Sequence, residues 1–205
     1  MDNNKKEAVK EALSVFFNIG PSDIPDEFVS KMKIKCCKKG DYLVRTGEIE
    51  SYFYFLLKGL DLCRFDGDES ERVKWIWNQP GTWLCVMGWL EPIRSIANIT
   101  IEEDSEVAMI AIQDFRKVAD KYPILRRKYM DALYSVNLFK CEEKLMLGKT
   151  NVERYRWFLE RFPQGMDVID HYKIASYLGM SPVTLSRIRH KEIEENKKRN
   201  GTREL

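Results

Sequence analysis

The sequence predicts an α+β protein with an antiparallel β domain first, a long helix next, and two short helices around a tight turn last. Three observations lead to this prediction. Apolar and polar residues alternate in short runs from about residue 33 to residue 112. A helical apolar repeat follows from Pro123 to about Met146. The stretch Leu178-Gly-Met-Ser-Pro then interrupts a helical pattern that resumes at once.

The N-terminal half begins with an amphipathic helix expected at residues 5–18, which Pro21 and Pro25 end. The strands that follow are separated by turn signals at near-regular spacing, each containing a glycine. This arrangement is typical of an antiparallel sandwich or barrel. The signals are Lys39-Gly-Asp, Thr46-Gly-Glu, Lys58-Gly, Asp66-Gly-Asp and Pro80-Gly.

Composition and charge narrow the class of protein. The chain has 205 residues and a net charge of +2, but residues 1–120 carry 16 Lys+Arg against 21 Asp+Glu, whereas residues 151–205 carry 11 against 8. The basic excess therefore lies in the half with the interrupted helix, as attraction to nucleic-acid phosphates requires. No stretch is long and apolar enough to span a membrane, and MDNNKKEAVK lacks the features of a signal peptide. Five cysteines at irregular spacing indicate a reduced, cytoplasmic protein.

A short helix is expected at residues 114–120, and Pro123 opens the long one. The apolar residues of the long helix recur at heptad-type spacing, which predicts a seam. The seam consists of Leu125, Tyr129, Ala132, Val136 and Phe139. Such a seam packs either on a second copy of the helix, as in a dimer, or on the β domain of its own chain.

The break near residue 180 has the features of a turn between two helices. Gly179 suits a left-handed helix end, Ser181 is a good N-cap, and Pro182 suits the first helical position. Leu185 and Ile188 would pack back on the first helix. The residues left to face outward are Ser181, Val183, Thr184, Ser186, Arg187 and Arg189. Hydroxyl and guanidinium groups so placed suit the DNA major groove, although an αα-hairpin of an ordinary helical domain has the same local pattern.

With these elements in order, the chain resembles the Crp/Fnr family of bacterial transcription regulators. The motifs that carry the resemblance are Lys39-Gly-Asp-Tyr-Leu-Val-Arg-Thr-Gly-Glu, Tyr54-Phe-Leu-Leu-Lys-Gly and Ile174-Ala-Ser-Tyr-Leu-Gly-Met-Ser-Pro-Val-Thr-Leu-Ser-Arg. The resemblance implies a jelly-roll-like sensor β-roll at residues 1–120, a dimerisation helix at 121–147 and a winged helix-turn-helix at 148–205. It also implies a homodimer, a small-molecule or redox signal, a palindromic DNA operator, and RNA polymerase as a further partner.

The family's DNA-reading positions can be carried over residue by residue. Arg187 matches an arginine that contacts a base edge, and Ser186 matches the serine before it. Val183 stands where a glutamate is common, so this position cannot accept a hydrogen bond from cytosine and would instead contact a thymine methyl. Ser181, Thr184 and Arg189 are expected at phosphates, although Ser181 is equally a plain helix cap.

The residues of the β-roll do not identify the effector. Cyclic-nucleotide binders of this superfamily have a glycine-glutamate pair followed by arginine-serine; Arg94-Ser95 matches the second part, but no glutamate occupies the first. We therefore expect an effector other than cyclic AMP, with Arg94 alternatively forming a surface salt bridge. Trp83, Met87 and Trp89 could line an apolar effector pocket together with Arg94 and Ser95, or they could simply be core.

Other sensing chemistries fit poorly. An iron–sulfur sensor needs spaced cysteines, whereas Cys36 and Cys37 are adjacent and would point to opposite faces of a strand. A thiol switch at these residues or at Cys141 stays open. Both histidines, His171 and His190, lie in the DNA-binding half, so no haem or metal site is expected. The cofactor is unknown from the sequence.

Three classes of function are weighed. The first is a homodimeric, sequence-specific DNA-binding regulator. The second is a ligand-binding module whose helix-turn-helix no longer binds DNA specifically, for which the loss of the glutamate at Val183 is an argument. An enzyme is not expected, because the sequence contains no catalytic triad, phosphate-binding loop or metal-ligand spacing.

Overall fold

The computed structural model describes residues 2–65, 72–84 and 93–201. The turn predicted at Asp66-Gly67 lies outside these residues, as do Met87 and Trp89 of the predicted effector pocket. The chain divides into two compact units, Met1–Phe139 and Lys140–Leu205. The division falls within helix α4 (Pro123–Met146), so that the last residues of this helix group with the C-terminal unit.

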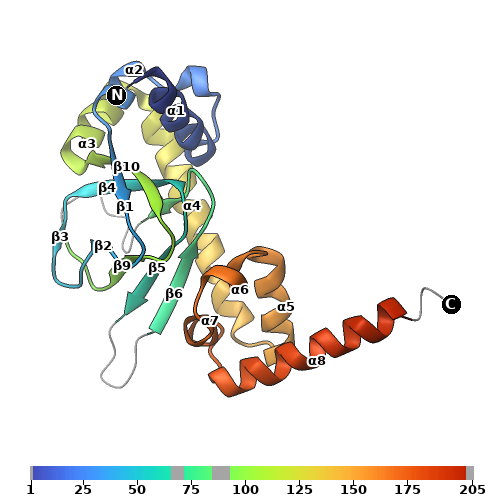
Figure 1. Ribbon diagram of the computed structural model, residues 1–205. Helices are drawn as coiled ribbons and strands as arrows, with labels where there is room; N and C mark the ends of the chain where they lie inside the picture. Colours follow the sequence, from blue (N-terminus) through green and yellow to red (C-terminus); the bar gives the residue numbers. More distant parts are fainter. Residues whose placement is uncertain (1, 66–71, 85–92, 202–205) are drawn as a thin grey trace. The chain divides into compact units, whose positions relative to one another are not determined.

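The N-terminal unit is built on two four-stranded antiparallel sheets, as the strand pattern predicts (Figure 1). The first sheet has the order β1-β10-β4-β7, with β1 (Lys33–Cys37), β10 (Ser105–Ala111), β4 (Tyr52–Lys58) and β7 (Trp83–Leu84). The second has the order β2-β9-β5-β6, with β2 (Tyr42–Val44), β9 (Asn98–Ile101), β5 (Asp61–Phe65) and β6 (Arg72–Trp77). A two-stranded ribbon joins β3 (Ile49–Glu50) to β8 (Ile93–Arg94).

Strand β4 is apolar along most of its length because both of its faces are buried. Phe53 and Phe55 belong to one hydrophobic cluster, shared with the helices, and Tyr54 and Leu56 belong to a second, shared with the other sheet. The neighbouring strand β10 follows the same rule, since Val107 pairs with Leu56 and lies in the second cluster. The first sheet is therefore the middle layer of the unit.

Helices cover the outer face of this sheet and gather at one end of the roll (Figure 1). They are α1 (Asn3–Phe17), the 3₁₀ turn η1 (Pro21–Asp23), α2 (Asp26–Ser30) and α3 (Ile112–Lys121). Aromatic rings fill the interface: the centroid of Phe115 lies 4.7 Å from that of Phe53 and 5.2 Å from that of Tyr129. Among the described residues, no helix combines the length and the apolarity needed to cross a bilayer.

The start of α4 is part of this core, which corrects the predicted dimer seam. Leu125, Tyr129 and Ala132 are 0%, 2% and 8% exposed within a single chain. A side chain already covered by its own chain has no surface left to bury against a second one. Val136 and Phe139, which share this side of the helix by spacing, are half-buried. The alternative of a helix packed on its own β domain is the correct one for the buried three.

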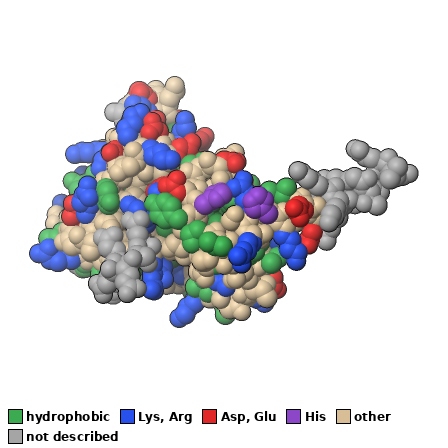
Figure 2. Space-filling view, turned by 60° about the horizontal axis from the view of Figure 1, so that its bottom comes forward, with side chains coloured by type: hydrophobic (Ala, Val, Ile, Leu, Met, Phe, Trp, Pro, Cys, Tyr) green, Lys and Arg blue, Asp and Glu red, His purple; other side chains and the backbone are tan. Residues whose placement is uncertain are grey.

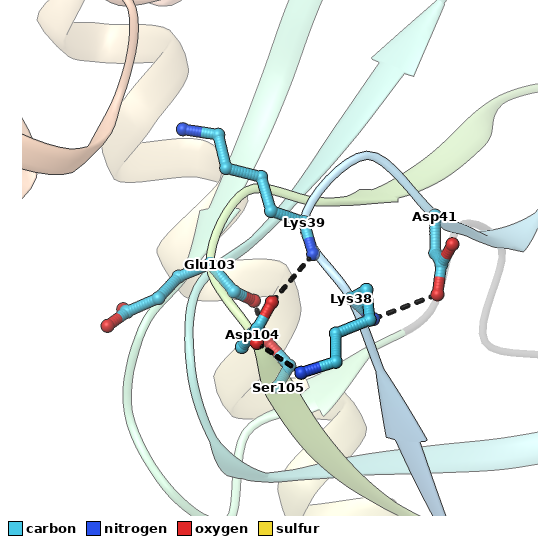
Figure 3. A network of polar contacts seen from close by, with 6 residues as sticks. All are labelled: Lys38, Lys39, Asp41, Glu103, Asp104 and Ser105. Carbon is cyan, nitrogen blue, oxygen red and sulfur yellow. Dashed lines mark hydrogen bonds and ion pairs between the residues drawn. The ribbon is translucent and has the colours of Figure 1, made fainter.

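A polar network fixes two turns at one end of the roll (Figure 3). The carboxylate of Asp104 accepts hydrogen bonds from the Lys38 ammonium at 2.6 Å and from the Lys39 amide at 3.0 Å. The amide of Lys38 donates to Asp41 at 2.8 Å. The predicted turn at Lys39-Gly-Asp is thus tied to the turn that leads into β10.

Below this network a carboxyl group is fully buried. Asp61 is 0% exposed, and its Oδ1 accepts a hydrogen bond of 3.0 Å from the hydroxyl of Ser105. Gly59 makes room for that hydroxyl, since a Cβ there would lie 1.9 Å from Ser105 Oγ, and its φ of +112° also excludes most other residues. Burial raises the pKa of Asp61 to about 7, the nearby Glu102 adds to the rise, and the Ser105 bond opposes it.

The C-terminal unit is helical, with α5 (Asn151–Arg161), α6 (Gly165–Val168), α7 (His171–Tyr177) and α8 (Pro182–Gly201). Thr150 and Glu153 cap α5 reciprocally. The winged form that the resemblance implies for residues 148–205 is not seen in the described part, because residues 148–201 contain no strand. The extension of α8 past α5, α6 and α7 is plain in Figure 1.

We predict that Asp61→Asn makes the protein more stable than the wild type at pH 8, by roughly 2 kcal/mol. The pKa of Asp61 in the folded chain is about 7 against an ordinary 3.8. The stability linked to this proton is therefore full below about pH 4 and is lost as the pH rises to 7. Asparagine keeps an acceptor for Ser105 and cannot ionise.

Urea unfolding of the full chain at pH 4.5, 6 and 8 tests this prediction. Glu103→Gln, an exposed neighbour, is the control and should leave the pH dependence of the wild type unchanged. An Asp61→Asn protein that is no more stable than the wild type at pH 8 would contradict it.

Candidate functional site

The turn between α7 and α8 has the local chemistry that the sequence predicts. Gly179 has a φ of 63°, in the left-handed region. Its amide donates to the carbonyl of Ser176 at 3.1 Å, and the amide of Met180 donates to that of Ala175 at 3.0 Å. This pair of bonds is the Schellman arrangement, which closes a helix over a glycine. Ala175 is fully buried, as the close crossing of two helices requires.

The start of α8 is capped as predicted. The Ser181 hydroxyl oxygen accepts a hydrogen bond from the Thr184 amide at 3.1 Å, and the two hydroxyl oxygens lie 2.9 Å apart. Pro182 is the first helical residue. Ser181 and Thr184, both predicted at DNA phosphates, are therefore also the cap of the helix.

Arg154 of α5 holds the turn from behind, a contact that the sequence analysis missed. Its Nη1 donates to the carbonyl of Leu178 at 2.6 Å and to that of Gly179 at 3.2 Å, and its Nη2 donates to Asn151 Oδ1 at 2.5 Å. A cation is favourable there, since the last carbonyls of a helix carry partial negative charge. No local pattern marks such a residue, because the two carbonyls that it holds lie more than twenty positions along the chain.

The outer face of α8 presents a compact set of side chains. Leu185 is fully buried and holds the helix on the unit, whereas Val183 is 60% exposed. Ser186, Arg187 and His190 are exposed too and lie on the side of Val183 by helical spacing. Figure 2 shows both histidine side chains on one face with Lys and Arg side chains beside them. This face offers a methyl-bearing group, a hydroxyl and a guanidinium within two helical turns.

Arg189, predicted at a DNA phosphate, lies beside this face and contacts α7. It is half-buried, and its Nη1 lies 2.7 Å from Nε2 of His171 at the start of α7. A guanidinium only donates, so His171 accepts through an unprotonated Nε2. Arg189 thus joins α8 to α7. The spacing of Arg189 from Leu185, four residues, was a signal that it leans toward the supporting side.

The predicted effector residues do not come together as one pocket in the described chain. Trp83 is 3% exposed, and its ring lies 5.2 Å from Phe53 and 5.6 Å from Tyr129. It is therefore part of the hydrophobic core, which corrects its assignment to a ligand pocket.

Arg94 and Ser95 lie on and just after β8. Arg94 is exposed and donates from Nη1 to the carbonyl of Gly47 at 2.9 Å. Ser95 is buried and donates to the carbonyl of Ala97 at 2.8 Å. Burial raises the pKa of the Glu50 carboxyl, and a hydrogen bond from Ser95 opposes the rise. A carboxyl beside Ser95 is an unfavourable neighbour for a bound phosphate whenever it is ionised.

Part of the N-terminal unit matches the model of a known domain family. A model of the cyclic nucleotide-binding domain family matches residues 34–122, from β1 to the end of α3. The potassium/sodium hyperpolarization-activated cyclic nucleotide-gated channel 2 of Mus musculus is 20% identical over 181 residues, which are 83% of this chain and 20% of the channel. The chain therefore spans only about a fifth of that relative's length.

Solved structures resemble a larger part of the chain. FixK2 from Bradyrhizobium japonicum has a TM-score of 0.69 at 16% identity, covering 80% of this chain and 86% of its own. The c-di-GMP-responsive regulator CLP of Xanthomonas campestris has a TM-score of 0.67 at 14% identity, covering 83% and 91%. A CooA mutant from Carboxydothermus hydrogenoformans has a TM-score of 0.63 at 14% identity, covering 90% and 84%. At these identities the likeness to Crp/Fnr regulators is one of fold.

We predict that Arg154→Lys destabilises the helices around the turn by roughly 1–2 kcal/mol, since one ammonium cannot replace the guanidinium fork. Arg126→Lys is the matched control, because Arg126 pairs with Asp120 at the surface, where both side chains are mostly exposed, and such pairs contribute little. Hydrogen exchange of the amides of α7 and α8 measures the effect. Equal exchange rates in the two variants would contradict the role given to Arg154.

Proposed function

We propose that the protein is a homodimeric, sequence-specific DNA-binding transcription regulator of the Crp/Fnr type, with an effector site in its N-terminal β-roll. The observation that carries the proposal is the exposed face of α8, borne on a capped helix that Arg154 and Leu185 fix from behind. The fold likeness to FixK2 and CLP supports it. A protein of this kind acts in the cytoplasm and also meets RNA polymerase.

In this proposal α8 enters the major groove of a palindromic operator. Arg187 forms a bidentate contact with guanine, and Val183 lies against a thymine methyl group. Ser186 adds a hydroxyl between them, while Ser181 and Thr184 contact phosphates at the start of the helix. Arg189 acts indirectly, by holding α8 on α7 through His171.

Two recognition helices are needed because one makes few contacts, so the proposal includes a dimer. The free surface for it is an exposed stripe on α4, which we call the α4 stripe and which consists of Tyr134, Leu138, Cys141 and Leu145. These residues recur at intervals of four, three and four, the spacing of a coiled-coil seam. By helical geometry they lie on the side of α4 opposite Leu125 and Tyr129, which the core of the chain already covers.

We propose an effector other than cyclic AMP. Cyclic-nucleotide recognition needs an arginine directed at the phosphate, whereas Arg94 is bonded to the carbonyl of Gly47. The carboxyl of Glu50 beside Ser95 adds a group that repels a phosphate when ionised. The effector is a small molecule of unassigned chemistry.

A second candidate is a ligand-binding module that has lost specific DNA binding. The observation in its favour is the continuation of α8 to Gly201, where the Crp/Fnr type has a wing. Selection of DNA from a random pool separates the two candidates.

We predict that DNA selected from a random pool by this protein is palindromic, and that Arg187→Ala weakens binding roughly tenfold per half-site and loses preference at one base pair. Lys191→Ala, an exposed α8 residue paired with Glu195, is the control and should keep the preference at every position. Fluorescence anisotropy at two salt concentrations measures both. No enriched sequence for the wild type would favour the second candidate.

We predict that Leu138→Glu dissociates the dimer by placing a charge in the α4 stripe, whereas Val15→Glu, at an exposed apolar residue of α1, leaves it intact. Sedimentation gives the two masses. Mild oxidation should also cross-link the wild type through Cys141, which a parallel seam brings next to its copy. A monomeric wild type, or a dimer that survives Leu138→Glu, would refute this seam.

A further inference from the structure

A partly buried contact joins the end of α4 to α7 inside the C-terminal unit. Glu143 lies on the part of α4 that groups with this unit, and its carboxylate accepts a hydrogen bond from the hydroxyl of Tyr177. The Tyr177 ring packs on Trp157 at 6.2 Å and on Phe162 at 5.9 Å. Neither residue contributes to the outer face of α8, and both belong to the support of that face.

The environment of this pair controls its protonation. Burial raises the pKa of Glu143 to about 7, while the Tyr177 hydrogen bond and the positive charges of Lys140 and Arg161 oppose the rise. Burial and the neighbouring Glu143 raise the pKa of Tyr177, so its hydroxyl stays the donor. Lys140 on α4, Arg161 on α5 and Tyr177 on α7 are the groups that act on the carboxyl from the elements around it.

A second contact joins the end of α4 to the turn after α7. A Cβ built on Gly179 would lie 3.3 Å from Cδ2 of Leu147, the residue after α4. The end of α4 therefore touches α7 at Tyr177 and the turn at Gly179. Both contacts lie within the C-terminal unit, which begins at Lys140.

We infer that Glu143 is a positioning residue: its packed contact with Tyr177 holds α7, and through the turn also α8, on the last turns of α4, and this contact opens more readily when the carboxyl, largely withdrawn from water, carries a charge. The inference rests on the proposed function, because it concerns how the recognition helix is presented to DNA. In this inference, pH regulates DNA binding through a contact that lies away from the DNA-reading residues.

The direction of the pH effect follows from linkage. The carboxyl has a pKa of about 7 in the closed contact and an ordinary 4.5 in water. Protonation therefore favours the closed contact, whose stability is full below about pH 4.5 and is lost as the pH rises through 7. Between pH 6 and pH 8 the ratio of closed to open contact falls about tenfold.

The test compares the full-length wild type with Glu143→Gln, which keeps an acceptor for Tyr177 but cannot ionise. Tyr177→Phe removes the donor, and Glu142→Gln removes an exposed carboxyl of the same helical turn as the matched control. Carbon-13 NMR of the glutamate carboxyls gives the pKa of Glu143 directly. Hydrogen exchange of α7 amides and affinity for the selected operator are measured at pH 6 and pH 8.

We expect the wild type and Glu142→Gln to lose more operator affinity from pH 6 to pH 8 than Glu143→Gln does, by up to about tenfold, since affinity follows the closed fraction. Effects of pH that do not involve Glu143 are common to all variants and cancel in this comparison. Exchange of α7 amides should rise with pH by a similar excess in the wild type, and Tyr177→Phe should show rapid exchange at both pH values.

A Glu143 carboxyl that titrates near 4.5 overturns the contact. A raised pKa with equal pH dependence of operator affinity in the wild type and Glu143→Gln overturns the positioning role. Absence of specific DNA binding by the wild type at either pH overturns the proposed function instead, and the NMR and exchange results then judge the contact by themselves.

Discussion

The packing of Tyr129 on the outer face of the first sheet determines which surfaces of the long helix remain free. Its ring lies within 6.0 Å of those of Phe53, Phe115 and Trp83. Because one side of α4 is thereby committed to the core, only the opposite side can meet a partner. The same aromatic cluster takes Trp83 away from any ligand. The packing of Tyr129 thus determines which side of α4 stays free, and it makes Trp83 a core residue.

In the C-terminal unit, the rigid turn between α7 and α8 determines where the side chains of α8 lie. A recognition helix discriminates between bases only if its side chains arrive at fixed positions, since a small displacement loses a bidentate contact. Gly179 closes α7, Arg154 holds the freed carbonyls, and Ser181 starts α8. Each of the three satisfies backbone groups that would otherwise be unpaired at a helix end. The arrangement therefore stabilises the turn and orients α8 at the same time.

Local chemistry is what could be predicted from the sequence. The ends of α4, the break at Gly179 and the cap at Ser181 each depend on residues within a few positions of one another. The heptad spacing was also real, but α4 carries two apolar stripes, and periodicity cannot tell which one meets the chain's own core. That choice depends on Phe53 and Phe115, which are distant in sequence.

Long-range contacts explain the other differences. The last part of α8 has few apolar residues to pack on the unit. Its glutamates find partners, however: Glu192 pairs with Arg156 of α5 at 2.8 Å, and Glu195 lies 3.8 Å from Lys191. Arg154, His171 and Glu143 likewise act through residues on other helices, so no window of the sequence singles them out.

The charge of the chain places a final constraint on the proposed mode of DNA binding. Residues 151–205 carry 11 basic against 8 acidic residues, and residues 1–120 carry 16 against 21. So small a basic excess gives little long-range attraction to DNA, and the acidic N-terminal half opposes it. Specific contacts must then supply most of the binding energy, which makes the geometry of Arg187 decisive. The loss of one proton from Glu143, as inferred, would therefore weaken the positioning of Arg187, on which most of the binding energy depends.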